Sequence, residues 1–161
     1  MISYRKTEKS DIKELVRVRG IFLTEYDGEN YLKSKESIDK EVEKYLNNFM
    51  ETENFTGFVA EKDGKIVGTS AVAFSDILPA ASYLNGRVAY ISNVFVFPES
   101  RKQGIAKKLF ELVVSEALLR NCSKISLHAS KDGEPVYKKF GFVKTTNEME
   151  YINEKFLELK K

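Results

Sequence analysis

The sequence predicts an α/β domain built on a mixed sheet, one with both antiparallel and parallel strand pairs. Two strand-like runs, Phe55–Glu61 and Lys65–Phe74, flank Lys62-Asp63-Gly64, and Asp-Gly between such runs is typical of an antiparallel hairpin turn. Between residues 88 and 129, a strand-like run, an amphipathic helix and a second strand-like run follow one another. That order predicts a crossover between two parallel strands. The length suits a single domain over residues 1–161, and no linker or repeat divides the chain.

The N-terminal third predicts one strand followed by two helices. Ile2–Arg5 reads as a short strand, and the apolar residues of Ile12–Leu23 recur at helical spacing. Tyr26–Asn30 is rich in Asp, Gly and Asn, which predicts a loop. Apolar residues at helical spacing then predict a second helix over Ser37–Met50.

The central part supplies the parallel pair. Ser75–Arg87 reads as a long loop. Val88–Phe97 is rich in β-branched and aromatic residues and predicts a strand that ends before Pro98. The apolar residues of Ile105–Leu119 predict a helix, and Lys124–Ala129 alternates as a short strand.

The C-terminal part predicts a short helix and a final strand pair. Pro135 stands near the start of the helix over Glu134–Phe140, and Gly141 ends it. Phe142–Thr145 and Glu148–Ile152 read as the last two strands.

Composition and charge exclude several classes of function. Apolar residues at 42% and charged residues at 31% are ordinary for a soluble globular protein. A formal net charge of +2 offers no broad basic surface for nucleic acid. The chain has no apolar stretch long enough to span a membrane, and its one cysteine, Cys122, reads as a packing residue. His128 is the only histidine, so no Cys/His set supports a metal site. We therefore expect a cytoplasmic protein without metal, nucleic-acid or membrane partners.

The turn Arg101–Ala106, between the central strand and its helix, is a candidate anion site. Gly104 removes a side chain where the backbone enters the helix, and two cations stand beside it. Free amides at a helix N-terminus suit a diphosphate, although such Gly-containing turns are also common without a ligand. The sequence contains neither GxxxxGK[ST] nor GxGxxG after a strand, so nucleotide hydrolysis and dinucleotide binding lose their main support.

The element order and two motifs resemble the GNAT superfamily of acyl-CoA-dependent N-acetyltransferases. Arg101-x-x-Gly104-x-Ala106 fits the R/Q-x-x-G-x-G/A loop of the family, and Tyr137–Phe142 fits its Y-x-x-x-G-F signature. The resemblance covers nearly the whole chain. It implies a mixed, mostly antiparallel sheet of seven strands, splayed at the central parallel pair and flanked by about four helices.

The resemblance also implies acetyl-CoA as the cosubstrate. Its pantetheine arm would bond to the backbone of Val94, Phe95 and Val96, and Ser130 stands where many relatives carry an Asn that contacts this arm. The diphosphate would lie on the amides of the turn that comprises Arg101, Lys102, Gln103, Gly104, Ile105 and Ala106. Lys131, Lys138 and Lys139 would lie near the adenosine 3′-phosphate, or simply in solvent.

Carried over in the same way, Tyr137 would act as the general acid that reprotonates the CoA thiolate. Many relatives carry a carboxylate eleven residues before the R/Q of the loop, and Tyr90 occupies that position here. Tyr90, Ser92 and Asn93 could hold a water that removes the proton of the amine, or the amine could arrive neutral. A structural hydrogen bond at a strand bulge is an equal reading for Asn93.

The acceptor is predicted only as a class. Glu25 could attract a cationic amine, and Tyr26 and Tyr83 could wall its site, although the acidic loop could equally be solvated. The resemblance implies transfer of an acetyl group to a primary amine by direct attack in a ternary complex, with a homodimer as a possible assembly. The alternative is a catalytically weak CoA-sensing or regulatory module, favoured by the missing strand carboxylate and disfavoured by Tyr137. A nucleic-acid adaptor is a remote third reading.

Overall fold

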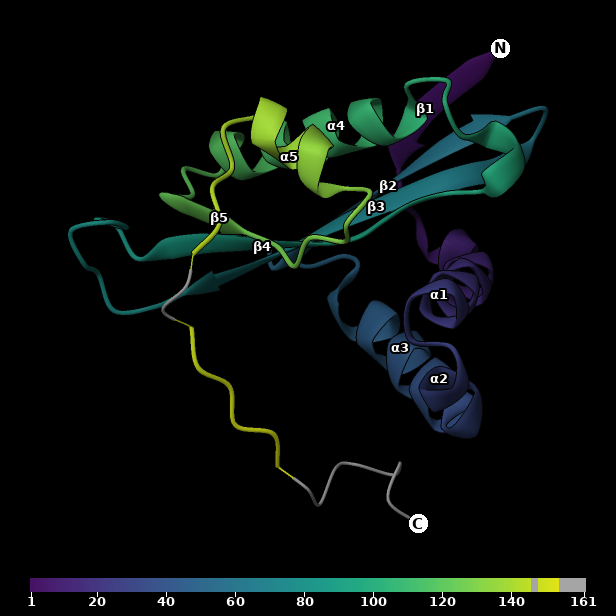
Figure 1. The fold of residues 1–161 in the computed structure, drawn as a ribbon, viewed down its shortest axis with the longest axis horizontal. Coiled ribbons are helices and arrows are strands. Elements are labelled where there is room, and N and C mark those ends of the chain that lie inside the picture. The colour runs from purple at the N-terminus through teal and green to yellow at the C-terminus, as the bar shows by residue number, and fades with distance from the viewer. Residues whose placement is uncertain (146–147, 154–161) are drawn as a thin grey trace.

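The protein folds around one five-stranded sheet, and the computed structural model describes residues 1–145 and 148–153. The strands follow the sheet in chain order, with every pair antiparallel except the last, which is parallel. This mixed sheet, visible edge-on in Figure 1, confirms the predicted fold class. The strands are β1 (Ile2–Lys6), β2 (Phe55–Lys62), β3 (Lys65–Asp76), β4 (Arg87–Val96) and β5 (Lys124–Ser126).

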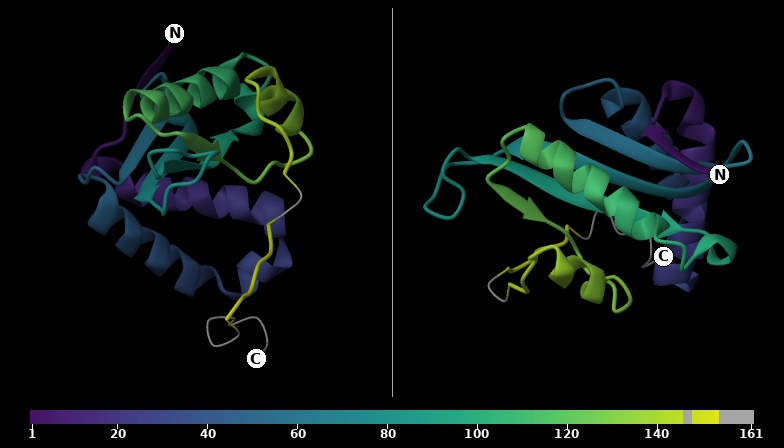
Figure 2. Two further views of the ribbon diagram at one scale, coloured as in Figure 1. Left: turned by 90° about the vertical axis from the view of Figure 1, so that its left-hand side faces the viewer. Right: turned by 90° about the horizontal axis from the view of Figure 1, so that it is seen from above.

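Helices cover both faces of the sheet. Figures 1 and 2 show α4 (Ile105–Leu119) and α5 (Glu134–Lys139) on one face. The other face carries α1 (Ile12–Asp27), α2 (Glu29–Lys33) and α3 (Lys35–Phe49). Each face has its own apolar cluster, so the sheet separates two hydrophobic cores.

The larger cluster lies under α4 and explains why that helix forms where the spacing predicts it. Leu109, Phe110, Val113 and Ala117 recur at helical spacing and are fully buried against the sheet. Their complete burial anchors α4, and therefore the turn that precedes it, to β4.

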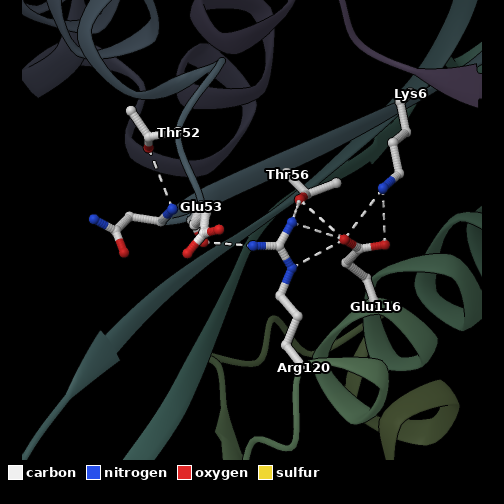
Figure 3. Close-up of polar contacts among 7 residues, drawn as sticks. Lys6, Thr52, Glu53, Thr56, Glu116 and Arg120 are labelled. Atoms are coloured by element: carbon white, nitrogen blue, oxygen red, sulfur yellow. Dashed lines mark hydrogen bonds and ion pairs between the residues drawn. The ribbon is translucent and has the colours of Figure 1, made fainter.

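Glu116 interrupts this apolar face, and a small ionic network explains it. The Oε1 atom of Glu116 accepts hydrogen bonds from Arg120 Nε at 3.0 Å and from Lys6 Nζ at 3.2 Å. Arg120 Nη2 also donates to Thr56 Oγ1 at 3.0 Å (Figure 3). The carboxylate therefore ties α4 to β1 and β2 instead of breaking the packing.

The hairpin between β2 and β3 confirms the Asp-Gly turn. Asp63 and Gly64 both have positive φ, 52° and 75°, as a type I′ turn requires. The pairing of Lys62 with Lys65 closes this hairpin.

Two predicted boundaries in the N-terminal half and centre are wrong. The predicted loop Tyr26–Asn30 is largely helical, because α1 continues to Asp27 and α2 begins at Glu29. Only Gly28, with φ 50°, breaks the helix. The strand predicted over Lys124–Ala129 ends at Ser126, since its neighbour β4 diverges from it there.

The last two predicted strands are also absent from the described residues. Phe142–Thr145 and Glu148–Ile152 have no regular structure there, and the intervening residues 146–147 lie outside the described part. The side chains of Val143, Met149 and Tyr151 are 82%, 96% and 91% exposed. These three apolar side chains therefore face solvent, whereas a strand of a packed sheet would bury the apolar side chains of one face.

Candidate functional site

The parallel pair at the edge of the sheet opens into a gap. β4 and β5 are paired only from Val88 with Lys124 to Tyr90 with Ser126. Beyond Tyr90, no described strand pairs with the outer edge of β4, which includes Val94, Phe95 and Val96. The N–H and C=O groups of a free strand edge can bind an extended chain as an additional strand. The predicted splay of the sheet is therefore present.

A β-bulge lies in β4 beside this gap. Opposite Thr69 and Ala71 the register shifts from Phe95 to Ser92, and Asn93 has a positive φ of 55°. Asn93 Nδ2 donates to Thr69 Oγ1 at 3.0 Å, and that hydroxyl donates to the Asn93 carbonyl at 3.2 Å. The side chain of Asn93 is thus held by structural hydrogen bonds, as one of its two sequence readings expected.

The bulge also changes which way the side chains of β4 point. Ala89 and Ile91 pack in the α4 cluster, so Tyr90 and Ser92 belong to the opposite face. The next residue, Asn93, would return to the α4 side in a regular strand, yet it lines the same cavity as Ser92. The bulge therefore presents two consecutive polar side chains to one face.

The turn before α4 has a left-handed backbone at two positions. Lys102 and Gly104 both have positive φ, 61° and 78°, and a Cβ built on Gly104 would meet no atom within 4 Å. Glycine is therefore favoured here by backbone conformation, and open space lies in front of it. The first amides of α4 have no acceptor within the helix, so they are free to bind an anion.

Arg101 is occupied with holding this turn in place. Its Nε donates to the carbonyl oxygen of Val96 at 2.9 Å, and its Nη2 pairs with Glu25 Oε2 at 2.7 Å. The side chain of Arg101 therefore links the turn to β4 and α1. The remaining members of the predicted phosphate loop, Lys102, Gln103, Ile105 and Ala106, follow the backbone of the turn into α4.

Tyr137 projects from α5 onto α4. Its ring lies 4.7 Å from that of Phe110, measured between centroids. A Cβ on Gly133 would come within 2.8 Å of the Tyr137 ring, so the small residue one turn earlier makes room for it. Burial raises the pKa of Tyr137, and its hydroxyl stays protonated at neutral pH. That is the state a proton donor requires.

Tyr90 and His128 meet across the gap. The Tyr90 hydroxyl and His128 Nδ1 are in hydrogen-bond contact, and His128 Nε2 lies 3.5 Å from Glu150 Oε1. Burial raises the pKa of Tyr90, while the positive charge of Arg19 acts in the opposite direction. A neutral phenol backed by an imidazole can pass a proton onward. No sequence motif links Tyr90 to His128, because they belong to different predicted strands.

A cavity of about 940 Å³ lies on the other face of the sheet, between α1, α3 and strands β2 to β4. We call it the α1–α3 cavity. Ser92 and Asn93 of the bulge form part of its wall, and Arg19 reaches it from α1. Tyr45 and Phe55 add apolar surface. The cavity therefore adjoins the bulge, on the face opposite α4.

The three predicted acceptor residues do not line this cavity and do not lie together. Glu25 pairs with Arg101, and the exposed ring of Tyr26 stacks on Phe22 at 5.8 Å. Tyr83 lies in the β3–β4 loop, where Lys124 is over its ring. Figure 1 shows this loop at the end of the sheet away from α1. No sequence motif singles out Arg19, which stands among the apolar residues along one side of the predicted helix Ile12–Leu23.

Ser130 has a local structural partner. Its hydroxyl accepts a hydrogen bond from the Gly133 amide at 3.1 Å, and its carbonyl oxygen accepts one from the Glu134 amide. These bonds shape the loop that enters α5. Ser130 thus helps to position the helix that carries Tyr137.

The chain is similar to known acetyltransferases in sequence. A family model described as an acetyltransferase (GNAT) domain matches residues 22–161. An uncharacterised N-acetyltransferase of Archaeoglobus fulgidus is 31% identical over 118 residues, which are 73% of this chain and 74% of that relative. An aminoglycoside N(6′)-acetyltransferase type 1 of Salmonella typhimurium is 25% identical over 103 residues, covering 60% of this chain and 68% of that protein.

Solved structures agree with these matches. A predicted acetyltransferase from Clostridium acetobutylicum, crystallised with acetyl-CoA, has a TM-score of 0.85 and 39% identity, with 96% of this chain and 97% of that chain covered. A GCN5-related N-acetyltransferase from Ralstonia eutropha has a TM-score of 0.82 at 22% identity, covering 94% of this chain and 99% of that chain. The second likeness concerns the fold alone.

Proposed function

Because this chain belongs to the GNAT family of acetyltransferases, we propose that it transfers the acetyl group of acetyl-CoA to a primary amine within a ternary complex. The observation that carries the proposal is the position of the β4 bulge. The bulge adjoins the free edge of β4, which continues into the turn Arg101–Ala106, and it also forms part of the wall of the α1–α3 cavity. Two substrates entering from opposite faces would meet there.

Acetyl-CoA is the cosubstrate of this family, and the residues present fit it. The backbone of Val94, Phe95 and Val96 would hold the pantetheine arm along the free edge of β4. The amides of Arg101–Ala106 would hold the diphosphate, for which Gly104 leaves open space. Acetyl-CoA supplies the activated thioester carbonyl.

The transfer itself needs few side chains. The amine nitrogen forms a bond to the thioester carbonyl carbon, the carbon–sulfur bond breaks, and the products are an amide and a thiolate. The amine loses one proton and the thiolate gains one. Tyr137 would donate the proton that the thiolate gains, since the raised pKa of Tyr137 keeps its hydroxyl protonated until a thiolate forms.

For proton removal from the amine, the structure favours the Tyr90 route over Asn93. Asn93 is held by Thr69, whereas Tyr90 contacts His128. A water held by Tyr90 and Ser92 could pass the proton through the tyrosine hydroxyl to the imidazole of His128. The carboxylate of Glu150 would then stabilise the imidazolium that forms.

A screen of amines tests the proposal. Purified protein is mixed with acetyl-CoA and a panel of primary amines that spans amino acids, amino sugars, polyamines and peptides, and the released thiol is measured. We expect turnover with at least one class and a product heavier by one acetyl group in mass spectrometry. Tight binding of acetyl-CoA with no turnover across the panel would contradict the enzyme proposal and favour the CoA-sensing alternative.

A further inference from the structure

The charged residues of the α1–α3 cavity are unequally neutralised. Glu41 and Lys44 belong to α3 and pair with each other at 3.3 Å on the exposed rim. Asp27 accepts a hydrogen bond from Asn30 Nδ2 at 3.2 Å, also in an exposed position. Arg19 is the remaining charged residue of the cavity wall.

Arg19 has no carboxylate partner among the described residues. Within residues 1–145 and 148–153, its Nη1 donates only to Asn93 Oδ1, at a long 3.4 Å, and the guanidinium lies 5.1 Å from the centre of the Phe22 ring. Burial lowers the pKa of Arg19, which reflects the cost of removing a cation from water. Arg17, two residues earlier on α1, shows the usual arrangement, because its Nε binds Glu14 at 2.8 Å in an exposed position.

The position of this cation relates it to the reaction centre. The hydrogen bond to Asn93 places the guanidinium next to the bulge, at the end of the cavity where the acceptor nitrogen would meet the thioester. The uncharged residues that line the same cavity include Ser92, Tyr45 and Phe55. A half-buried guanidinium with free donors in such a wall is suited to bind a carboxylate or phosphate in charge-assisted hydrogen bonds.

We propose that Arg19 binds an anionic group that the acceptor carries close to its primary amine, as an amino acid carries its carboxylate. The inference rests on the proposed function and narrows its substrate class to amino acids or amino phosphates. It assigns the apolar wall of the cavity to the remainder of the acceptor. The cation would also favour the neutral form of the nearby amine, which is the form that attacks.

Binding measurements with matched ligand pairs test this inference without requiring turnover. The full-length protein is first saturated with CoA, and L-methionine is titrated against L-methioninamide, and L-phenylalanine against its carboxamide. A third pair, 2-aminoethyl phosphate and ethanolamine, distinguishes phosphate from carboxylate. We expect the anionic member of at least one pair to bind about tenfold tighter or more, as a charge-assisted hydrogen bond would give.

Variants assign the preference to Arg19. In Arg19→Gln the preference should fall to about onefold, and Arg19→Lys should retain part of it. Arg17→Gln is the matched control, because it removes a neighbouring cation of the same helix, and it should keep the full preference. A wild-type protein that binds none of the probes, that prefers the uncharged members, or that keeps its preference in Arg19→Gln would overturn the inference.

The same samples separate this inference from the proposed function. Turnover without any preference for an anionic amine would leave the proposed function standing and overturn the role of Arg19. Arg19-dependent binding of an anionic amine with no thiol release from acetyl-CoA would support the binding site and contradict the transferase proposal.

Discussion

Two tyrosines near the gap have raised pKa values but different surroundings. Tyr137 is packed between α5 and α4, and no described side chain accepts a hydrogen bond from its hydroxyl. Tyr90 is partly exposed and contacts His128. The first arrangement suits a residue that gives up a proton to sulfur, and the second suits one that passes a proton to another base.

Replacing Tyr137 by Phe should lower kcat by about 100-fold, a typical contribution of one general acid. The affinity for acetyl-CoA should change little, because the ring packing on Phe110 is retained. Steady-state kinetics and calorimetry on one preparation measure both quantities. Tyr4→Phe is the control, since Tyr4 is another partly buried tyrosine packed against the α4 cluster. Equal turnover in Tyr137→Phe would remove Tyr137 from the mechanism.

The Tyr90–His128 contact predicts that turnover depends on both side chains. His128→Gln should lower kcat at neutral pH by about 100-fold, a typical contribution of one general base, because the imidazole can no longer accept a proton from the Tyr90 hydroxyl.

The other charged and titratable groups near Tyr90 and His128 are the same in wild type and in His128→Gln, so they do not account for a difference in rate between the two proteins. Arg19, Tyr26 and Glu148 act on Tyr90, and Glu150 faces His128. Tyr90→Phe, which breaks the contact between phenol and imidazole, should reproduce the loss. An unchanged kcat in His128→Gln would show that the proton leaves by another route.

At the scale of elements, α4 is held by charge as well as by apolar packing. Burial disfavours the ionised form of Glu116, but the hydrogen bonds from Lys6 and Arg120 outweigh it, and the pKa of Glu116 is lowered. A carboxyl group whose pKa is lower in the folded state stabilises the protein above its unfolded pKa of about 4.3. That stabilisation is lost as the pH falls through the folded-state pKa.

Glu116→Gln should therefore lower the free energy of unfolding by about 2 kcal/mol at pH 7, because Lys6 and Arg120 lose their counter-charge. The difference from wild type should shrink below about pH 4. Urea denaturation at both pH values measures it. Glu111→Gln, which removes a more exposed carboxylate of the same helix, should have a small effect at either pH. A pH-independent deficit in Glu116→Gln would contradict this account.

Elements with a local signal could be predicted from the sequence, and those that depend on distant neighbours could not. The Asp-Gly hairpin and the face of α4 follow from residues next to one another in the chain. The end of β5 depends on where β4 diverges. In the described part of the two predicted C-terminal strands, Phe142 packs on the α4 cluster, whereas Val143, Met149 and Tyr151 are exposed, so their apolar pattern does not correspond to a buried strand face. Gly28 correctly predicts the end of α1, but nothing in the sequence around it indicates that a second helix, α2, begins at the next residue.

The candidate site divides in the same way. The turn at Gly104 and the residue Tyr137 lie in short motifs, so the sequence was sufficient to propose them. The contact of Tyr90 with His128 joins residues 38 positions apart. Arg19 meets Asn93 from 74 positions away. Neither pair has a sequence pattern, because each depends on how α1 and the end of β5 pack beside β4.

At the scale of the whole molecule, the sheet separates the two proposed binding sites, and the β4 bulge lies between them. Helices α4 and α5 cover one face of the sheet and α1 to α3 cover the other (Figure 2). The proposed anion site precedes α4, and the α1–α3 cavity lies on the opposite face. No helix among the described residues is long and apolar enough to cross a membrane. The arrangement predicts that changes in one site leave binding in the other largely intact.

Calorimetric titration of acetyl-CoA into wild type, Gly104→Glu and Gly64→Glu tests the central claim most directly. Gly64 is a close match for Gly104, since both have positive φ, 75° and 78°, and a Cβ on either would meet nothing within 4 Å. The backbone strain of the two variants should be similar, about 1 kcal/mol, and thermal unfolding checks that both fold. We predict that wild type and Gly64→Glu bind acetyl-CoA alike, while Gly104→Glu, with a carboxylate in the phosphate position, does not bind. Binding of equal strength in Gly104→Glu, or no binding in folded wild type, would contradict the cofactor site and the transferase function built on it.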